Sequence, residues 1–108
     1  MLLSEAIRDL DKLPEDATLF AERVEGHFAP TSQLLSIELT DEERATPVVE
    51  VAARRAPGKH YFLEVFVARE ALAGWRSMRG VERLPPEEAT RVVIHYAEND
   101  VWPQHRAG

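Results

Sequence analysis

The sequence predicts an α+β fold in which a small three-stranded sheet packs against helices, in the order α-β-β-α-β-α-α. Apolar residues recur at helical spacing in some stretches, and they alternate or run densely in others, as strands do. Proline and glycine separate these stretches. A chain of 108 residues, 44% hydrophobic and 30% charged, supports one domain. We therefore expect a single domain over residues 1–103 and a frayed tail at 104–108.

The first expected element is a helix from about Ser4 to Leu13, with Ser4 as its N-cap residue. Pro14 ends this helix. Its buried face is predicted from apolar residues three or four positions apart: Leu3, Ala6, Ile7, Leu10 and Leu13.

Two strands should follow and form a hairpin. Residues 18–23 are rich in strand formers, and residues 33–39 alternate, with Leu35, Ile37 and Leu39 on one face. Residues 25–30 would be the exposed hairpin loop.

The middle of the chain allows two interpretations. Residues 41–44 are a polar connection, after which Thr46 and Pro47 resemble an N-cap followed by a first-turn proline. They favour a short helix over residues 47–56, although valines at 48, 49 and 51 keep a strand as the alternative.

The second half should contain one strand and two helices. Residues 60–67 are apolar on both faces except at Glu64, as in a central strand covered on both sides. A helix with Trp75 on its apolar stripe then ends at Gly80. The last helix starts at Pro85 and Pro86, and Pro103 closes it.

Composition limits the compartment and the class of partner. The chain has no cysteine, so disulfides and thiolate chemistry are excluded and a cytoplasmic location is expected. The acidic start lacks the pattern of a signal peptide, and the apolar stretch at 61–68 is too short for a membrane span. The net charge of −6 argues against nucleic-acid and membrane partners.

No pattern indicates catalysis or a bound cofactor. No serine lies in a Gly-x-Ser-x-Gly turn, and the single glycines form no phosphate loop. His95 and Glu98 have helical spacing, but one such pair does not make a metal site. We therefore expect no enzyme activity, no metal and no cofactor.

Glu64 most needs an explanation. On a regular strand it would face the same side as Phe62 and Phe66, where an unpaired carboxylate is costly. One interpretation is structural: a salt bridge to an arginine, with Arg54, Arg55, Arg69 and Arg91 as candidates, or a position at a sheet end where the side chain reaches water. The other is a ligand-facing acid in a small-molecule or enzymatic site, with His60 or His95 nearby.

Charge is distributed unevenly along the chain. Residues 1–50 contain 12 acidic and 4 basic residues, whereas residues 51–108 contain 7 acidic and 9 basic ones. The hairpin and its flanks could therefore present an acidic surface that attracts a basic protein. The contacts predicted on that surface are Glu38, Asp41, Glu42 and Glu43.

Trp102 follows the last helix. It could pack back on the domain or anchor an interface, for example in a homodimeric accessory protein. The sequence leaves open whether the chain is a monomer or a homodimer.

Three stretches resemble a family of small bacterial domains of unknown function: Leu13 to Phe20 with its Leu-Pro start, Tyr61 to Val67, and Tyr96 to Asp100 with its Tyr-x-x-Asn-Asp-like end. The resemblance implies an immunity-like protein that neutralises a toxin. The sequence thus predicts a non-catalytic interaction domain whose acidic surface would cover a basic toxin.

Overall fold

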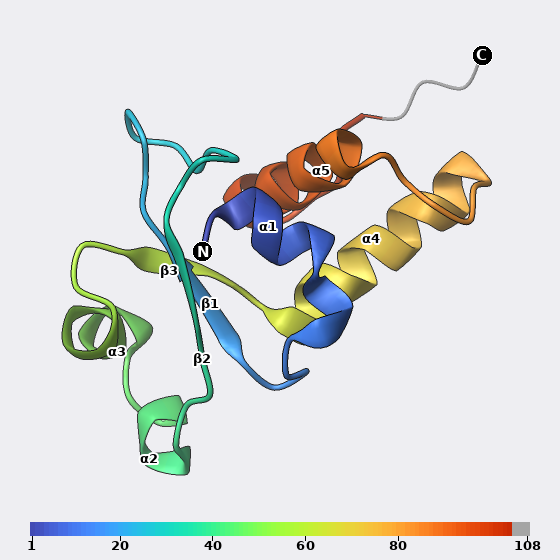
Figure 1. Cartoon of the computed structure of the whole chain (residues 1–108). Coiled ribbons are helices and arrows are strands. Elements are labelled where there is room, and N and C mark those ends of the chain that lie inside the picture. The colour runs from blue at the N-terminus through green and yellow to red at the C-terminus, as the bar shows by residue number, and fades with distance from the viewer. Residues whose placement is uncertain (105–108) are drawn as a thin grey trace.

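A three-stranded sheet forms the middle layer of the computed structural model, which describes residues 1–104. Helices α1, α4 and α5 lie on one side of it, and α2 and α3 lie on the other (Figure 1). The elements in chain order are α1 (Leu3–Arg8), a 3-10 turn (Leu10–Lys12), β1 (Thr18–Ala21), β2 (Leu34–Ile37), α2 (Asp41–Arg44), α3 (Val48–Arg55), β3 (His60–Glu64), α4 (Val65–Arg79) and α5 (Pro86–Asn99). The predicted α+β class and element order are confirmed. Of the expected tail at 104–108, only Gln104 belongs to the described residues.

The sheet has the order β2-β1-β3, and both pairs are antiparallel. The central strand is therefore β1, whose four residues are all buried. The prediction of a central strand over residues 60–67 is wrong, because β3 lies at an edge and ends at Glu64. The chain then turns directly into α4, where Val65 and Ala68 pack in the core from a helix.

The two faces of the sheet bury separate hydrophobic clusters. The larger one joins β1 and β3 to α1, α4 and α5, and it includes Leu19, Phe62 and Trp75. On the other face, Phe20 packs against Val51 of α3. Ile37 and Leu39 pack against this second cluster, as their alternation predicts.

The N-terminal part differs from the prediction in its details. α1 begins at Leu3, so Ser4 lies inside the helix, and the Glu5 carboxylate accepts the Leu2 N–H at 2.7 Å in place of a serine cap. In the β1–β2 connection, Glu25 and Gly26 have φ of 53° and 84° and make a tight turn. Phe28 is buried rather than exposed, with its ring centre 4.9 Å from that of Phe62.

Residues 47–56, for which the sequence allows a helix or a strand, contain the helix α3. Val51 and Ala52 of α3 are buried, whereas Val49 is 77% exposed, which is the burial pattern of an amphipathic helix on a sheet. Residues 41–44, expected as a connection, form the short helix α2.

Helix α4 ends where the sequence predicts, with Gly80 in the left-handed conformation at φ 67°. α5 ends at Asn99, four residues before Pro103. None of the helices in residues 1–104 has the length and apolar composition of a transmembrane span.

Candidate functional site

Glu64 owes its orientation to a β-bulge in β3. Thr18 of β1 pairs with Glu64 and Leu19 with Leu63, but Phe20 pairs with Tyr61, so Phe62 is the extra residue. Residues three apart on a regular strand point to opposite faces, and the extra residue removes that alternation. Tyr61 and Glu64 therefore both lie on the α3 side, while Phe62 enters the core under the helices.

The expectation that Glu64 shares a face with Phe62 and Phe66 is therefore wrong for Phe62. Phe66 belongs to the first turn of α4 and is 42% exposed. It does line the same cavity as Glu64, but from a helix and not from the strand.

Glu64 lines a cleft of about 440 Å³, which we call the Glu64 cleft. Its walls come from the start of β1, from α2 and α3, from the end of β3 and from the first turn of α4. The lining residues are Asp16, Thr18, Leu39, Glu43, Arg44, Thr46, Val48, Val51, Tyr61, Glu64 and Phe66.

Within residues 1–104, Glu64 has no ion-pair partner. Its carboxylate accepts a 2.5 Å hydrogen bond from the hydroxyl of Tyr61. Burial, together with this neighbouring carboxylate, raises the pKa of Tyr61 well above its ordinary value, so the phenol stays protonated as the donor. A half-buried carboxylate is thus held by one neutral donor.

The arginines proposed as partners of Glu64 are placed elsewhere. Arg55 binds Glu43, and Arg54 lies 3.8 Å from Glu50. Arg69 donates to the backbone oxygens of Leu10 and Leu13, and Arg91 makes no ion pair with a residue in the described part of the chain. The salt-bridge interpretation of Glu64 is therefore wrong for these four arginines. Glu64 is instead the half-buried last residue of β3, as in the sheet-end interpretation, and it also lines a cavity.

The other charged groups of the cleft are already paired. Asp16 lies 3.6 Å from Arg44, in a pair whose side chains are both largely exposed. Glu43 binds Arg55 through both carboxylate oxygens, at 2.6 and 2.7 Å. Glu64 is thus the acid of this cleft that a bound cation could neutralise without displacing an arginine.

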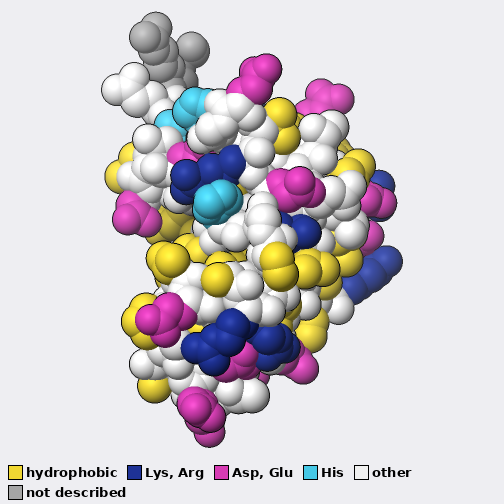
Figure 2. Space-filling view, turned by 90° about the vertical axis from the view of Figure 1, so that its left-hand side faces the viewer, with side chains coloured by type: hydrophobic (Ala, Val, Ile, Leu, Met, Phe, Trp, Pro, Cys, Tyr) yellow, Lys and Arg dark blue, Asp and Glu magenta, His cyan; other side chains and the backbone are white. Residues whose placement is uncertain are grey.

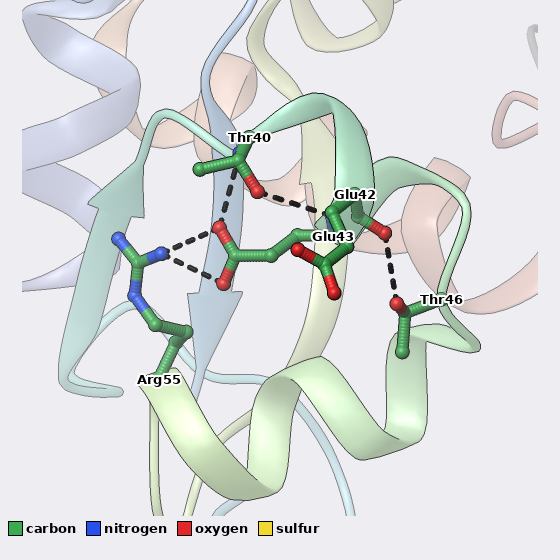
Figure 3. Close-up of polar contacts among 5 residues, drawn as sticks. All are labelled: Thr40, Glu42, Glu43, Thr46 and Arg55. Atoms are coloured by element: carbon green, nitrogen blue, oxygen red, sulfur yellow. Dashed lines mark hydrogen bonds and ion pairs between the residues drawn. The ribbon is translucent and has the colours of Figure 1, made fainter.

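The Glu43 carboxylate forms its hydrogen bonds and its ion pair with residues of the same domain. Its carboxylate accepts the Thr40 N–H, and the Thr40 hydroxyl accepts the Glu43 N–H, which together form a capping box at the start of α2 (Figure 3). These bonds and the Arg55 guanidinium hold the pKa of Glu43 below its ordinary value. Of the four predicted contacts, Glu43 is therefore the one whose charge is engaged within the domain.

Glu38, Asp41 and Glu42 are exposed, and their side chains make no ion pair within residues 1–104. Glu38 follows β2, and the other two lie in the first turn of α2. Basic side chains lie among acidic ones on the lower part of the face in Figure 2, so the surface is not uniformly acidic. The three free acids adjoin the cleft, because Leu39 and Glu43 next to them line it.

His27, His60 and His95 do not line the cleft. His60 is exposed at the start of β3, and His95 bonds the Val101 oxygen at 3.0 Å. Glu98, which the spacing paired with His95, instead contacts His27 and the N–H of Phe28. No group of three or more potential metal ligands occurs among the described residues.

Trp102 packs back on the domain. Its indole N–H donates to the Ala71 oxygen at 2.8 Å, and its ring lies 5.5 Å from that of Tyr96. A Cβ at Gly74 would come within 2.6 Å of the indole, so this glycine makes room for Trp102 in the middle of α4. Trp102 remains 38% exposed.

Comparison of the chain with protein-family models, with curated proteins and with solved structures gives no match. The resemblance to small bacterial domains stays a prediction, and the geometry of the site is the basis of the functional argument.

Proposed function

We propose that this chain is a non-catalytic protein-interaction domain that receives a cationic side chain of a basic partner in the Glu64 cleft. The observation that carries the proposal is the half-buried Glu64 carboxylate, which lines a cavity and has a hydrogen bond from Tyr61 but no cation within residues 1–104. An entering lysine or arginine would supply the opposite charge, and Val48 and Phe66 would contact its aliphatic stem.

The exposed acids beside the cleft would guide the partner. Glu38, Asp41 and Glu42 make no ion pair within residues 1–104, so their field acts on an approaching basic surface. Glu43 would contribute less than the sequence predicts, because Arg55 already neutralises it.

The most specific version of this proposal is that the chain is an immunity-like protein. The partner would then be a basic toxin, and a cytoplasmic monomer or homodimer of this chain would cover its surface. The support comes from the acidic first half of the chain and from the family resemblance.

The Glu64 cleft also favours a second candidate function, a binding site for a small cationic molecule. The cavity of about 440 Å³ lies within the ~300–1,000 Å³ range of small-molecule pockets. Because neither His60 nor His95 lines it, an enzymatic version of this candidate would have to rely on Glu64 and Tyr61. Saturable binding of an amine in place of any protein partner would favour this candidate.

The interaction proposal is tested by capturing partners from the native host and measuring the association rate of the purified partner. The variant Glu38→Lys/Glu42→Lys should lower the on-rate by ~10-fold at low salt, because it reverses the guiding charges. The control Glu25→Lys/Glu70→Lys makes the same change in net charge at two exposed positions that do not line the cleft. Equal on-rates for the two variants would contradict the proposal.

A further inference from the structure

A second cavity, of about 580 Å³, opens in the helical layer between α1, α4 and the segment that leads into α5. It shares no lining residue with the Glu64 cleft. The function proposed above makes no use of it.

Four arginines line this cavity: Arg8 of α1, Arg69 and Arg76 of α4, and Arg83 of the α4–α5 segment. The acids in its lining are Asp11 and Glu82, so the cavity carries an excess of positive charge in a chain whose net charge is −6. We call it the arginine cavity.

Arg76 and Arg83 have no ion pair and no side-chain hydrogen bond with any residue in 1–104. Arg69 is fixed by two bonds from Nη2, of 3.1 Å to the Leu10 oxygen and 2.7 Å to the Leu13 oxygen. Its Nε is buried without a hydrogen-bond partner, and the nearest carboxylate oxygen, on Asp11, is 4.0 Å away. The fold thus holds a guanidinium in place while leaving one of its donors unused.

Converging arginines repel one another, and a buried donor without an acceptor is unfavourable. An anionic ligand offsets the repulsion between the arginines, and the planar fork of arginine matches the oxygens of a phosphate group. The remaining wall is apolar and includes Leu72, Leu84 and Ala89, which would contact an uncharged part of the ligand.

We propose that the arginine cavity binds a small molecule that combines a phosphate group with a less polar ring, of about the size of a nucleoside monophosphate. Its volume lies within the ~300–1,000 Å³ range of ligand pockets. The phosphate would lie between Arg69, Arg76 and Arg83, and the ring would lie against the apolar wall.

The test is a calorimetric titration of the full chain with adenosine monophosphate, inorganic phosphate and adenosine at constant ionic strength. We expect saturable binding of the monophosphate, weaker binding of phosphate, and the weakest binding of adenosine. The variant Arg76→Gln/Arg83→Gln should weaken binding of the monophosphate by ~10-fold or more, since it removes two charged hydrogen-bond donors from the cavity.

The control is Arg91→Gln, which removes one positive charge from an exposed arginine outside the cavity and is compared with the single variants Arg76→Gln and Arg83→Gln. It should leave the affinity within ~2-fold of the wild type. Circular dichroism would verify that all variants are folded, and the single substitutions at Arg76 and Arg83 replace the double variant if it unfolds. The proposal is overturned by the absence of saturable binding, or by an equal loss of affinity in the cavity and control variants.

Discussion

Glu64 and Glu43 show how neighbouring carboxylates of one cleft acquire different roles. Glu43 has an arginine and a backbone N–H as partners, so its charge is used within the fold. Among the residues that the structure describes, Glu64 has only the Tyr61 hydroxyl as a side-chain partner. The free energy of a half-buried carboxylate falls when a cation approaches it, and Glu64 is therefore the better place for a partner to bind.

Glu43 leads to a prediction about pH. Its pKa is lower in the folded chain than the ordinary value of 4.5, so its contribution to stability is present above that value and is lost as the pH falls through the folded pKa. Glu43→Gln should therefore lower the urea midpoint at about pH 7 and have a much smaller effect at about pH 3. Urea unfolding at the two values measures this, and the same difference at both would contradict the assigned role of Glu43.

At the residue scale, the sequence identified the important acid but not its surroundings. Glu64 is the one charge in an apolar run, which singles it out from sequence alone. Its partner Tyr61 is three residues away, a spacing that on a regular strand would place it on the opposite face. A single sequence has no pattern that identifies a β-bulge, so the hydrogen bond between Tyr61 and Glu64 could not be predicted.

The sequence indicates only part of the arginine cavity. Arg69, Leu72 and Arg76 follow one another at helical spacing and thus share a face of α4. Arg8 and Arg83 join them only through the packing of α1 and the α4–α5 segment, which the sequence pattern does not specify.

At the element scale, α3 determines whether the Glu64 cleft exists. It is a helix of eight residues that covers the sheet face around Phe20 and supplies Val48 and Val51 to the cleft. A helix this short is marginal alone, so its stability must come from packing on the sheet.

Two valines of α3 make a matched test of this packing. Val51 is 1% exposed and Val49 is 77% exposed, so the same substitution removes a core contact at one position and surface atoms at the other. Val51→Ala should lower the free energy of unfolding by about 1–3 kcal/mol, and Val49→Ala should change it by less than about 0.5 kcal/mol. Chemical denaturation measures both, and equal effects would mean that α3 does not pack as described.

Element types were predicted better than element boundaries. Helical periodicity and Gly80 predicted α4 and its end, because a helix must bury one stripe and needs a left-handed residue to stop. The boundary between β3 and α4 was misplaced by three residues, because apolar residues after Glu64 suit a buried strand and a buried helix equally.

At the scale of the whole molecule, the sheet separates two cavities of opposite character. The Glu64 cleft is lined from α2 and α3 next to exposed acids, and the arginine cavity is lined from α1, α4 and α5. Figure 1 shows these two groups of helices on opposite sides of the sheet. Both cavities draw residues from both halves of the chain, so their charge comes from the packing and not from the acidic first half or the slightly basic second half alone. Each cavity would select a ligand of the opposite sign.

The central claim is that Glu64 receives a cation, and the most direct measurement is a nuclear magnetic resonance titration with a short arginine-containing peptide. The amide shifts should concentrate around the cleft, at Thr18, Thr46 and Glu64. Glu64→Gln keeps an acceptor for Tyr61 but removes the charge, so it should weaken binding several-fold, whereas Glu70→Gln at an exposed position should not. Shifts spread over the whole surface, or equal binding by the two variants, would contradict the claim.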